Sequence, residues 1–157
     1  MTGTAASLRL LGHGLAELPS PGFDMSSLAA GTWADTGLEV QLPGAGVYQL
    51  DATVRGSLTI ESPANVWTLA RLFDVTDGAV VPRSELLVNQ HNLIPGDGTV
   101  TELGDNRTAS TALEYNVAAP SVLRLQASWA AATGTPKRAG IGTDPLGRTM
   151  IRFNRIA

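Results

Sequence analysis

Few side chains in this sequence have the chemistry of a catalytic or metal-binding centre. The chain contains two histidines, His13 and His91, and no cysteine. A zinc site without cysteine needs three converging histidine or carboxylate ligands, and two histidines far apart provide no such spacing. The lack of cysteine also excludes disulfides, thiolate ligands and a cysteine nucleophile. We therefore expect no metal site and no cofactor.

A serine nucleophile or a carboxylate pair would be the remaining route to catalysis. Ser84 lies near His91 in the sequence, but it falls in a strand pattern and the chain lacks a G-x-S-x-G elbow. The acidic pair Asp74 and Asp77 flanks a glycine-containing turn, where aspartate is favoured for turn chemistry. We therefore predict no catalytic residues and a protein that is not an enzyme.

Three arginines, Arg148, Arg152 and Arg155, lie in or beside the last apolar segment of the chain. In a regular strand, Arg152 would point to the face opposite Ile151 and Phe153. The planar guanidinium of arginine binds carboxylates in a bidentate manner, which makes it a preferred residue at interfaces. The three arginines are candidates for a subunit interface, and a plain exposed edge strand would explain them equally well.

The three tryptophans are candidates for binding a sugar ring, as in a carbohydrate-binding module. Trp67 and Trp129 lie in strand patterns, where packing in the core is the default expectation. Trp33 precedes the first regular strand pattern and is the freer of the three. Trp33 is therefore the candidate ligand-binding residue if the protein is a carbohydrate- or receptor-binding module.

These candidates must be positioned by strands, because apolar and polar residues alternate from Trp33 onward. The clearest runs are 38–42, 48–54 and 123–129. A side-chain period of two is typical of strands with one buried and one wet face. The 17 glycines and 9 prolines supply turns between such strands. The pattern predicts an all-β fold, an antiparallel β-sandwich of jelly-roll type, in which residues 132–145 form a loop.

The chain of 157 residues has the size of one domain, and its first 30 residues lack sustained periodicity. We interpret residues 1–30 as an extended arm with the apolar residues Leu8, Leu10 and Leu11 as contacts, and residues 31–157 as the sandwich. The start of the chain has no basic segment and no unbroken apolar run, so we expect no signal peptide. A net charge of −3 argues against nucleic-acid partners, and the lack of a long apolar run argues against membrane partners.

From Gly31 to the end, the chain resembles the C1q and tumour-necrosis-factor type of jelly roll. The resemblance is carried by Gly46-Val47-Tyr48-Gln49-Leu50 followed by Ala52 and Val54, by Trp67-x-Leu69-x-Arg71-Leu72, by the strand from Leu123 to Trp129, and by Phe153 in a closing strand. Members of that family have a Gly-x-Tyr turn and strand whose aromatic ring lies in the core.

The resemblance implies a role as well as a fold. Similar domains occur as fibre heads, spikes and head decorations of phage and phage-like particles, where they form homotrimers. It therefore implies a non-enzymatic virion structural protein on the particle surface, made in the host cytoplasm and anchored by its N-terminal arm to the major capsid protein or another particle protein. The alternative is a carbohydrate- or receptor-binding module of a tail fibre or adhesin, with a host-surface glycan as partner. The third hypothesis is a cupin-like enzyme. It would need histidines clustered on strands, and this chain has only two histidines, far apart.

Overall fold

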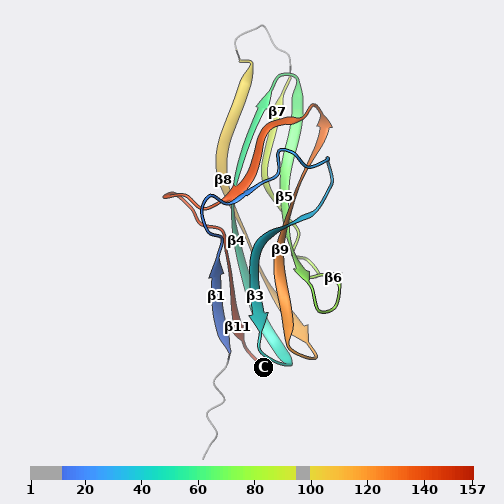
Figure 1. Ribbon diagram of the computed structural model, residues 1–157, viewed down its shortest axis with the longest axis vertical. Helices are drawn as coiled ribbons and strands as arrows, with labels where there is room; N and C mark the ends of the chain where they lie inside the picture. The colour runs from blue at the N-terminus through green and yellow to red at the C-terminus, as the bar shows by residue number, and fades with distance from the viewer. Residues whose placement is uncertain (1–11, 95–99) are drawn as a thin grey trace, which may run out of the picture.

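The computed structural model describes residues 12–94 and 100–157, which form two antiparallel sheets packed face to face (Figure 1). Sheet A contains β1 (His13–Glu17), β2 (Phe23–Asp24), β4 (Gly46–Glu61), β8 (Glu102–Val117), β10 (Pro136–Gly142) and β11 (Met150–Arg155). Sheet B contains β3 (Ala34–Leu42), β5 (Ala64–Asp74), β6 (Ala79–Val80), β7 (Leu86–Leu93) and β9 (Ser121–Thr133). Among the described residues, no helix is long and apolar enough to cross a membrane.

The strand order confirms the predicted jelly-roll sandwich. In sheet A, one side of β4 pairs with β8. The other side of β4 pairs with β11 over its first part and with β10 over its second part. β1 pairs with the far side of β11, and β2 pairs with the far side of β10. In sheet B, the order is β3-β9-β5, with β7 and β6 beyond β5. The chain crosses repeatedly from one sheet to the other, so strands adjacent in a sheet are distant in sequence, as in a jelly roll.

The core lies between the two sheets and is built from the predicted alternation. Tyr48, Leu50, Ala52 and Val54 point inward from β4, and each is almost completely buried. Alternate residues of β9 from Leu123 to Trp129 complete the opposite wall. The alternation therefore identified the buried face of both strands.

The described part of the expected arm, residues 12–30, belongs to the sandwich instead. β1 pairs with β11 and β2 pairs with β10, so both strands extend sheet A. Leu18 and Met25 are buried in the core, where they remove apolar surface from water. The sandwich thus begins before residue 30. Leu8, Leu10 and Leu11 lie outside the described residues.

The segment expected to be a loop, residues 132–145, contains a strand in the structure. β9 continues to Thr133, and β10 pairs with β4 over Pro136–Gly142. After the irregularity between Pro136 and Arg138, only Ala139 and Ile141 mark β10 as a strand from the inside, and glycines occupy two of its outward positions. Too few side chains remained to produce a visible period of two.

Candidate functional site

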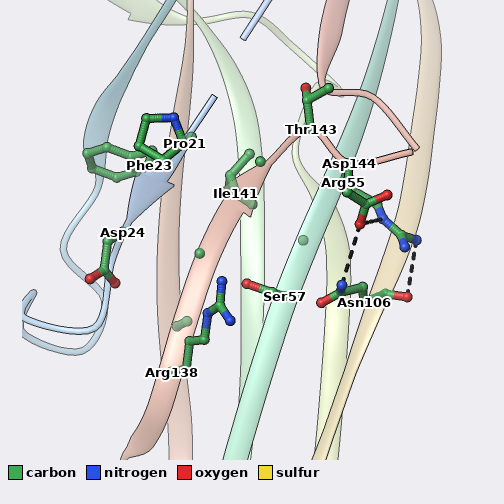
Figure 2. A pocket seen from close by; sticks show the side chains of 15 residues that line it. Pro21, Phe23, Asp24, Arg55, Ser57, Asn106, Arg138, Ile141, Thr143 and Asp144 are labelled. Atoms are coloured by element: carbon green, nitrogen blue, oxygen red, sulfur yellow. Dashed lines mark hydrogen bonds and ion pairs between the residues drawn. The ribbon is translucent and has the colours of Figure 1, made fainter. Parts of the chain in front are cut away.

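A groove of about 350 Å³ lies on the outer face of sheet A, between β2, β10, β4 and β8 (Figure 2). Its floor is β10, whose outward positions are Arg138, Gly140 and Gly142. Gly140 pairs with Ser57 of β4, and Gly142 pairs with Arg55. Because two successive outward positions lack a side chain, the sheet surface is hollow at this point.

Gly142 is not required by the backbone. Its φ lies outside the left-handed region, and a Cβ placed there would meet nothing closer than the Pro21 carbonyl oxygen at 3.9 Å. Gly22 is different, because its φ is +89° and a Cβ would collide with the backbone of Ile141. Gly22 therefore allows the chain before β2 to approach β10, whereas Gly142 leaves open a space that a side chain would fill.

One wall of the groove is a fixed network around Arg55. Its Nε donates a hydrogen bond to Asp144 Oδ2 at 2.9 Å, and its Nη1 donates to the Asn106 carbonyl oxygen at 3.1 Å. The Asn106 side-chain amide donates to the same Asp144 oxygen at 3.4 Å. The hydrogen bond from Arg55 holds the pKa of Asp144 below its usual value. These contacts join β4, β8 and the segment after β10.

The opposite wall carries Asp24 at the end of β2. Its Oδ1 accepts hydrogen bonds from the Ser26 hydroxyl at 2.6 Å and the Ser26 backbone N–H at 2.9 Å. The Ser26 side chain, the Ser26 backbone and the charge of Arg138 together lower the pKa of Asp24. The carboxylate is therefore ionised and held in one orientation, and its Oδ2 has no hydrogen-bond partner within residues 12–94 and 100–157.

Two further polar groups, the side chains of Arg138 and Ser57, lie between the walls. Figure 2 shows both near the middle of the groove, with Asp24 to one side and the Arg55 network to the other. Within residues 12–94 and 100–157, neither side chain takes part in a hydrogen bond or an ion pair. Among the residues that the structure describes, the Arg138 guanidinium, the Ser57 hydroxyl and Asp24 Oδ2 are therefore unpaired groups of the groove.

A second hollow of about 430 Å³ continues the groove along β4 and β8. It shares Ser57, Asn106 and Arg138 with the first hollow and extends to Thr59 and Gly104. Arg138 thus lies where the two hollows meet, and the combined site is elongated along the strands.

The three arginines predicted at an interface lie elsewhere on the molecule. Arg148 forms an ion pair with Glu17 at 3.0 Å, and Arg152 forms one with Asp51 at 3.0 Å. Arg155 donates to the carbonyl oxygen of Ala157. β11 lies between β1 and β4, so it is not an edge strand, and the plain edge-strand explanation does not apply. The interface role of these arginines stays a prediction.

The predicted ligand residue Trp33 has one face of its ring covered. The guanidinium carbon of Arg71 lies 4.0 Å from the ring centroid, which is a cation–π contact. Arg71 is itself positioned by a hydrogen bond from its Nε to Gln126 Oε1 at 3.0 Å. Trp33 belongs to the sheet B side of the sandwich and does not line the groove. Its role in ligand binding stays a prediction.

Ser84 and His91 are not brought together as a nucleophile and a base. Ser84 is buried, and its Oγ donates to the Val81 carbonyl oxygen at 2.7 Å and accepts from the Leu72 N–H at 3.0 Å. His91 is also buried, with its Nε2 3.0 Å from Asp105 Oδ1. Each residue therefore has a structural environment of its own.

Sequence reasoning missed the groove because it treated β10 as a loop. The signal that could have found it was Ala139 alternating with Arg138 and Gly140, followed by Ile141 and Gly142. The contributions of Asp24 and Asn106 were not detectable, since they reach the groove only through strand pairing.

The comparisons with known proteins concern the fold. No family model matches the sequence, and no curated protein matches it. A solved structure of Eiger TNF from S. frugiperda is 12% identical with a TM-score of 0.45, covering 94% of this chain and 93% of that one. The structure of the Gx strain of infectious bursal disease virus is 12% identical with a TM-score of 0.48, covering all of this chain and 41% of that one. By its own strand order, the protein is a jelly-roll β-sandwich.

Proposed function

We propose that the protein is a non-enzymatic structural subunit of a phage or phage-like particle, displayed on the particle surface as a homotrimer. The subunit would serve as a head decoration, spike or fibre protein. The observation that carries the proposal is an apolar strip on the outer face of sheet B, on the opposite side of the sandwich from the groove.

The apolar strip consists of Trp67, Leu69 and Phe73 of β5 with Leu87 of β7 and Val80 of β6. Leu69 lies opposite Leu87, and Phe73 lies opposite Val80, so the five side chains share one face. Leu87 is 51% exposed. The inward residues of β5 are buried in the core, so Trp67 is not in the core as its strand pattern suggested.

Apolar residues on both faces of β5 support the proposal that a partner covers the outer face of sheet B. A strand with one wet face alternates between apolar and polar residues, whereas a strand covered on both faces does not. Contiguous exposed apolar patches on soluble proteins mark interaction sites. On the outer row of β5, Arg71 and Asn65 are the polar exceptions.

A second copy of the chain is the occupant that we propose for the apolar strip. In a closed trimer, each interface joins two different surfaces of neighbouring copies. The open edge of β8 offers the second surface. Within the described residues, the 16 residues of β8 pair with β4 alone, so the other edge of β8 is open. Leu113 and Tyr115 lie on the inward face of β8 and are partly buried. An unpaired edge of this length is otherwise prone to aggregation, and an interface would cover it.

Attachment to the particle is the part of the proposal that rests on the sequence. Leu8, Leu10 and Leu11 remain the candidates for contact with the major capsid protein or another particle protein. Arg148, Arg152 and Arg155 are candidates for ion pairs with the same partner. Residues 12–30 are not available as a free arm, because they belong to the sandwich.

Light scattering coupled to size exclusion tests the trimer. The protein should elute at three times its chain mass of 16.3 kDa. Leu87→Glu should shift it to a monomer without changing its circular dichroism spectrum, because a charge would then be buried in the interface. Leu15→Glu is the matched control, since Leu15 is 61% exposed on the outer face of sheet A.

Two results would contradict the proposal. A strictly monomeric wild-type protein would exclude the trimer. A trimer that persists in Leu87→Glu but dissociates in Leu15→Glu would place the interface on sheet A, where Leu15 lies opposite Arg152.

A further inference from the structure

We propose that the groove on the outer face of sheet A binds a neutral saccharide, with one sugar ring on the glycine floor and the next in the adjoining hollow. The proposal concerns a different surface from the apolar strip and does not rest on the assembly argued above. It also differs from the Trp33 hypothesis, because Trp33 is not part of the groove.

The size and shape of the groove suit a small polar ligand. Its first hollow, about 350 Å³, falls within the range of about 300–1,000 Å³ that is usual for ligand sites. The floor at Gly140 and Gly142 lets a flat ring approach the sheet, with Pro21 beside it as an apolar contact. The second hollow extends the site in one direction, as a ligand built from linked units requires.

The polar groups that remain free match the chemistry of a sugar. Each sugar hydroxyl both donates and accepts a hydrogen bond, so its site must offer acceptors and donors side by side. Here Asp24 Oδ2 accepts, the Arg138 guanidinium donates, and the Ser57 hydroxyl does either. The Ser26 contacts hold Asp24 in place before any ligand arrives, which reduces the entropy lost on binding.

The charge of the groove favours a neutral ligand. Two cationic side chains, Arg55 and Arg138, line the first hollow together with two anionic ones, Asp24 and Asp144. Arg55 is already neutralised by its hydrogen bond to Asp144. The charge of Arg138 acts on Asp24, whose pKa it helps to lower. A phosphate or carboxylate would therefore have to bind beside the Asp24 carboxylate, which repels anions.

The test begins with an array of neutral and acidic oligosaccharides, followed by calorimetric titration of the full chain with the best neutral one. The wild-type protein should bind neutral oligosaccharides in preference to sialylated or uronic-acid ones. Gly142→Val and Arg138→Gln should each weaken binding at least about tenfold, because one fills the first hollow and the other removes the donor between the two hollows. Arg124→Gln, on sheet B, is the matched control and should bind like the wild type.

Three outcomes would overturn the proposal. One is that no neutral saccharide binds at millimolar concentration, and another is that only acidic saccharides bind. The third is that binding survives both groove variants and is lost in Trp33→Ala. Equal melting temperatures of the variants and the wild type exclude unfolding as the cause of lost binding. If Gly142→Val does not fold, Arg138→Gln alone decides the outcome, since its side chain lies on the surface.

Discussion

At the scale of single residues, Asp74 shows how a buried carboxylate can join the two sheets. It is completely buried at the end of β5 in sheet B. Its Oδ1 accepts hydrogen bonds from the N–H groups of Thr76 and Asp77, and its Oδ2 accepts one from the Tyr115 hydroxyl of β8 in sheet A at 2.9 Å. Three donors compensate for the removal of the charge from water. The aspartate predicted for turn chemistry therefore also connects the sheets.

The hydrogen bond between Tyr115 and Asp74 predicts a loss of stability at alkaline pH. Burial and the Asp74 carboxylate raise the pKa of Tyr115 well above its usual value of 10.0. Above about pH 10, the unfolded chain releases a proton that the folded chain keeps, so the stability from this pair falls as pH rises. Urea unfolding at about pH 8 and about pH 11 should show a smaller alkaline loss for Tyr115→Phe than for the wild type.

The same variant has a second expected effect at neutral pH. Tyr115→Phe should cost about 1–3 kcal/mol, because it leaves one oxygen of a buried carboxylate without its donor. An alkaline loss of equal size in both proteins would contradict the first prediction, because it would show that the pKa of Tyr115 is not raised in the folded state.

At the scale of elements, the N-terminal strands β1 and β2 change the boundary of the domain. They pair with β11 and β10, and the segment between them buries Leu18. The Leu18 N–H donates to the Thr149 carbonyl oxygen at 2.8 Å, and the Leu18 carbonyl oxygen accepts from the Thr143 hydroxyl. Residues 12–30 therefore contribute to the stability of the sandwich.

A pair of leucine substitutions tests this role. Leu18→Ala should lower the free energy of unfolding by about 2–4 kcal/mol, because it leaves a cavity in the core. Leu15→Ala should change it by less than about 0.5 kcal/mol, because Leu15 lies on the surface of the neighbouring strand. Chemical denaturation measures both. Equal, small effects would indicate that this segment behaves as the arm that the sequence suggested.

At the scale of the whole molecule, the two outer faces of the sandwich have different character. The outer face of sheet B carries the apolar strip around Leu87, and the outer face of sheet A carries the polar groove around Gly142. The core lies between them, and no residue of the apolar strip lines the groove. The proposed assembly surface and the proposed saccharide site therefore use different faces of one domain.

This separation predicts independent effects of the two key variants. Leu87→Glu should abolish the proposed trimer and leave saccharide affinity per chain unchanged, and Gly142→Val should weaken saccharide binding and leave the proposed trimer intact. The double variant should show both effects at their single-variant sizes, because distant sites without shared partners are additive. Light scattering and calorimetry on the same samples measure both. Saccharide affinity that falls with Leu87→Glu would show that the groove is completed by a neighbouring copy.

The sequence alone determined the fold class and the buried face of the long strands. Tyr48 to Val54 and Leu123 to Trp129 were assigned correctly, because the backbone of any strand turns alternate side chains to opposite faces. This information is local, so a short run of residues contains it. It was lost where the alternation is sparse, as in β10, where glycines occupy two of the outward positions.

The tertiary structure alone decided which residues of different strands share an outward face. Trp67 and Leu87 are separated in sequence, and strand pairing brings their strands side by side in the apolar strip. Asp24, Ser57 and Arg138 meet only because β10 pairs with both β2 and β4. The physical reason is that strand pairing joins distant segments, and the pattern within one strand specifies its own faces but not its neighbours.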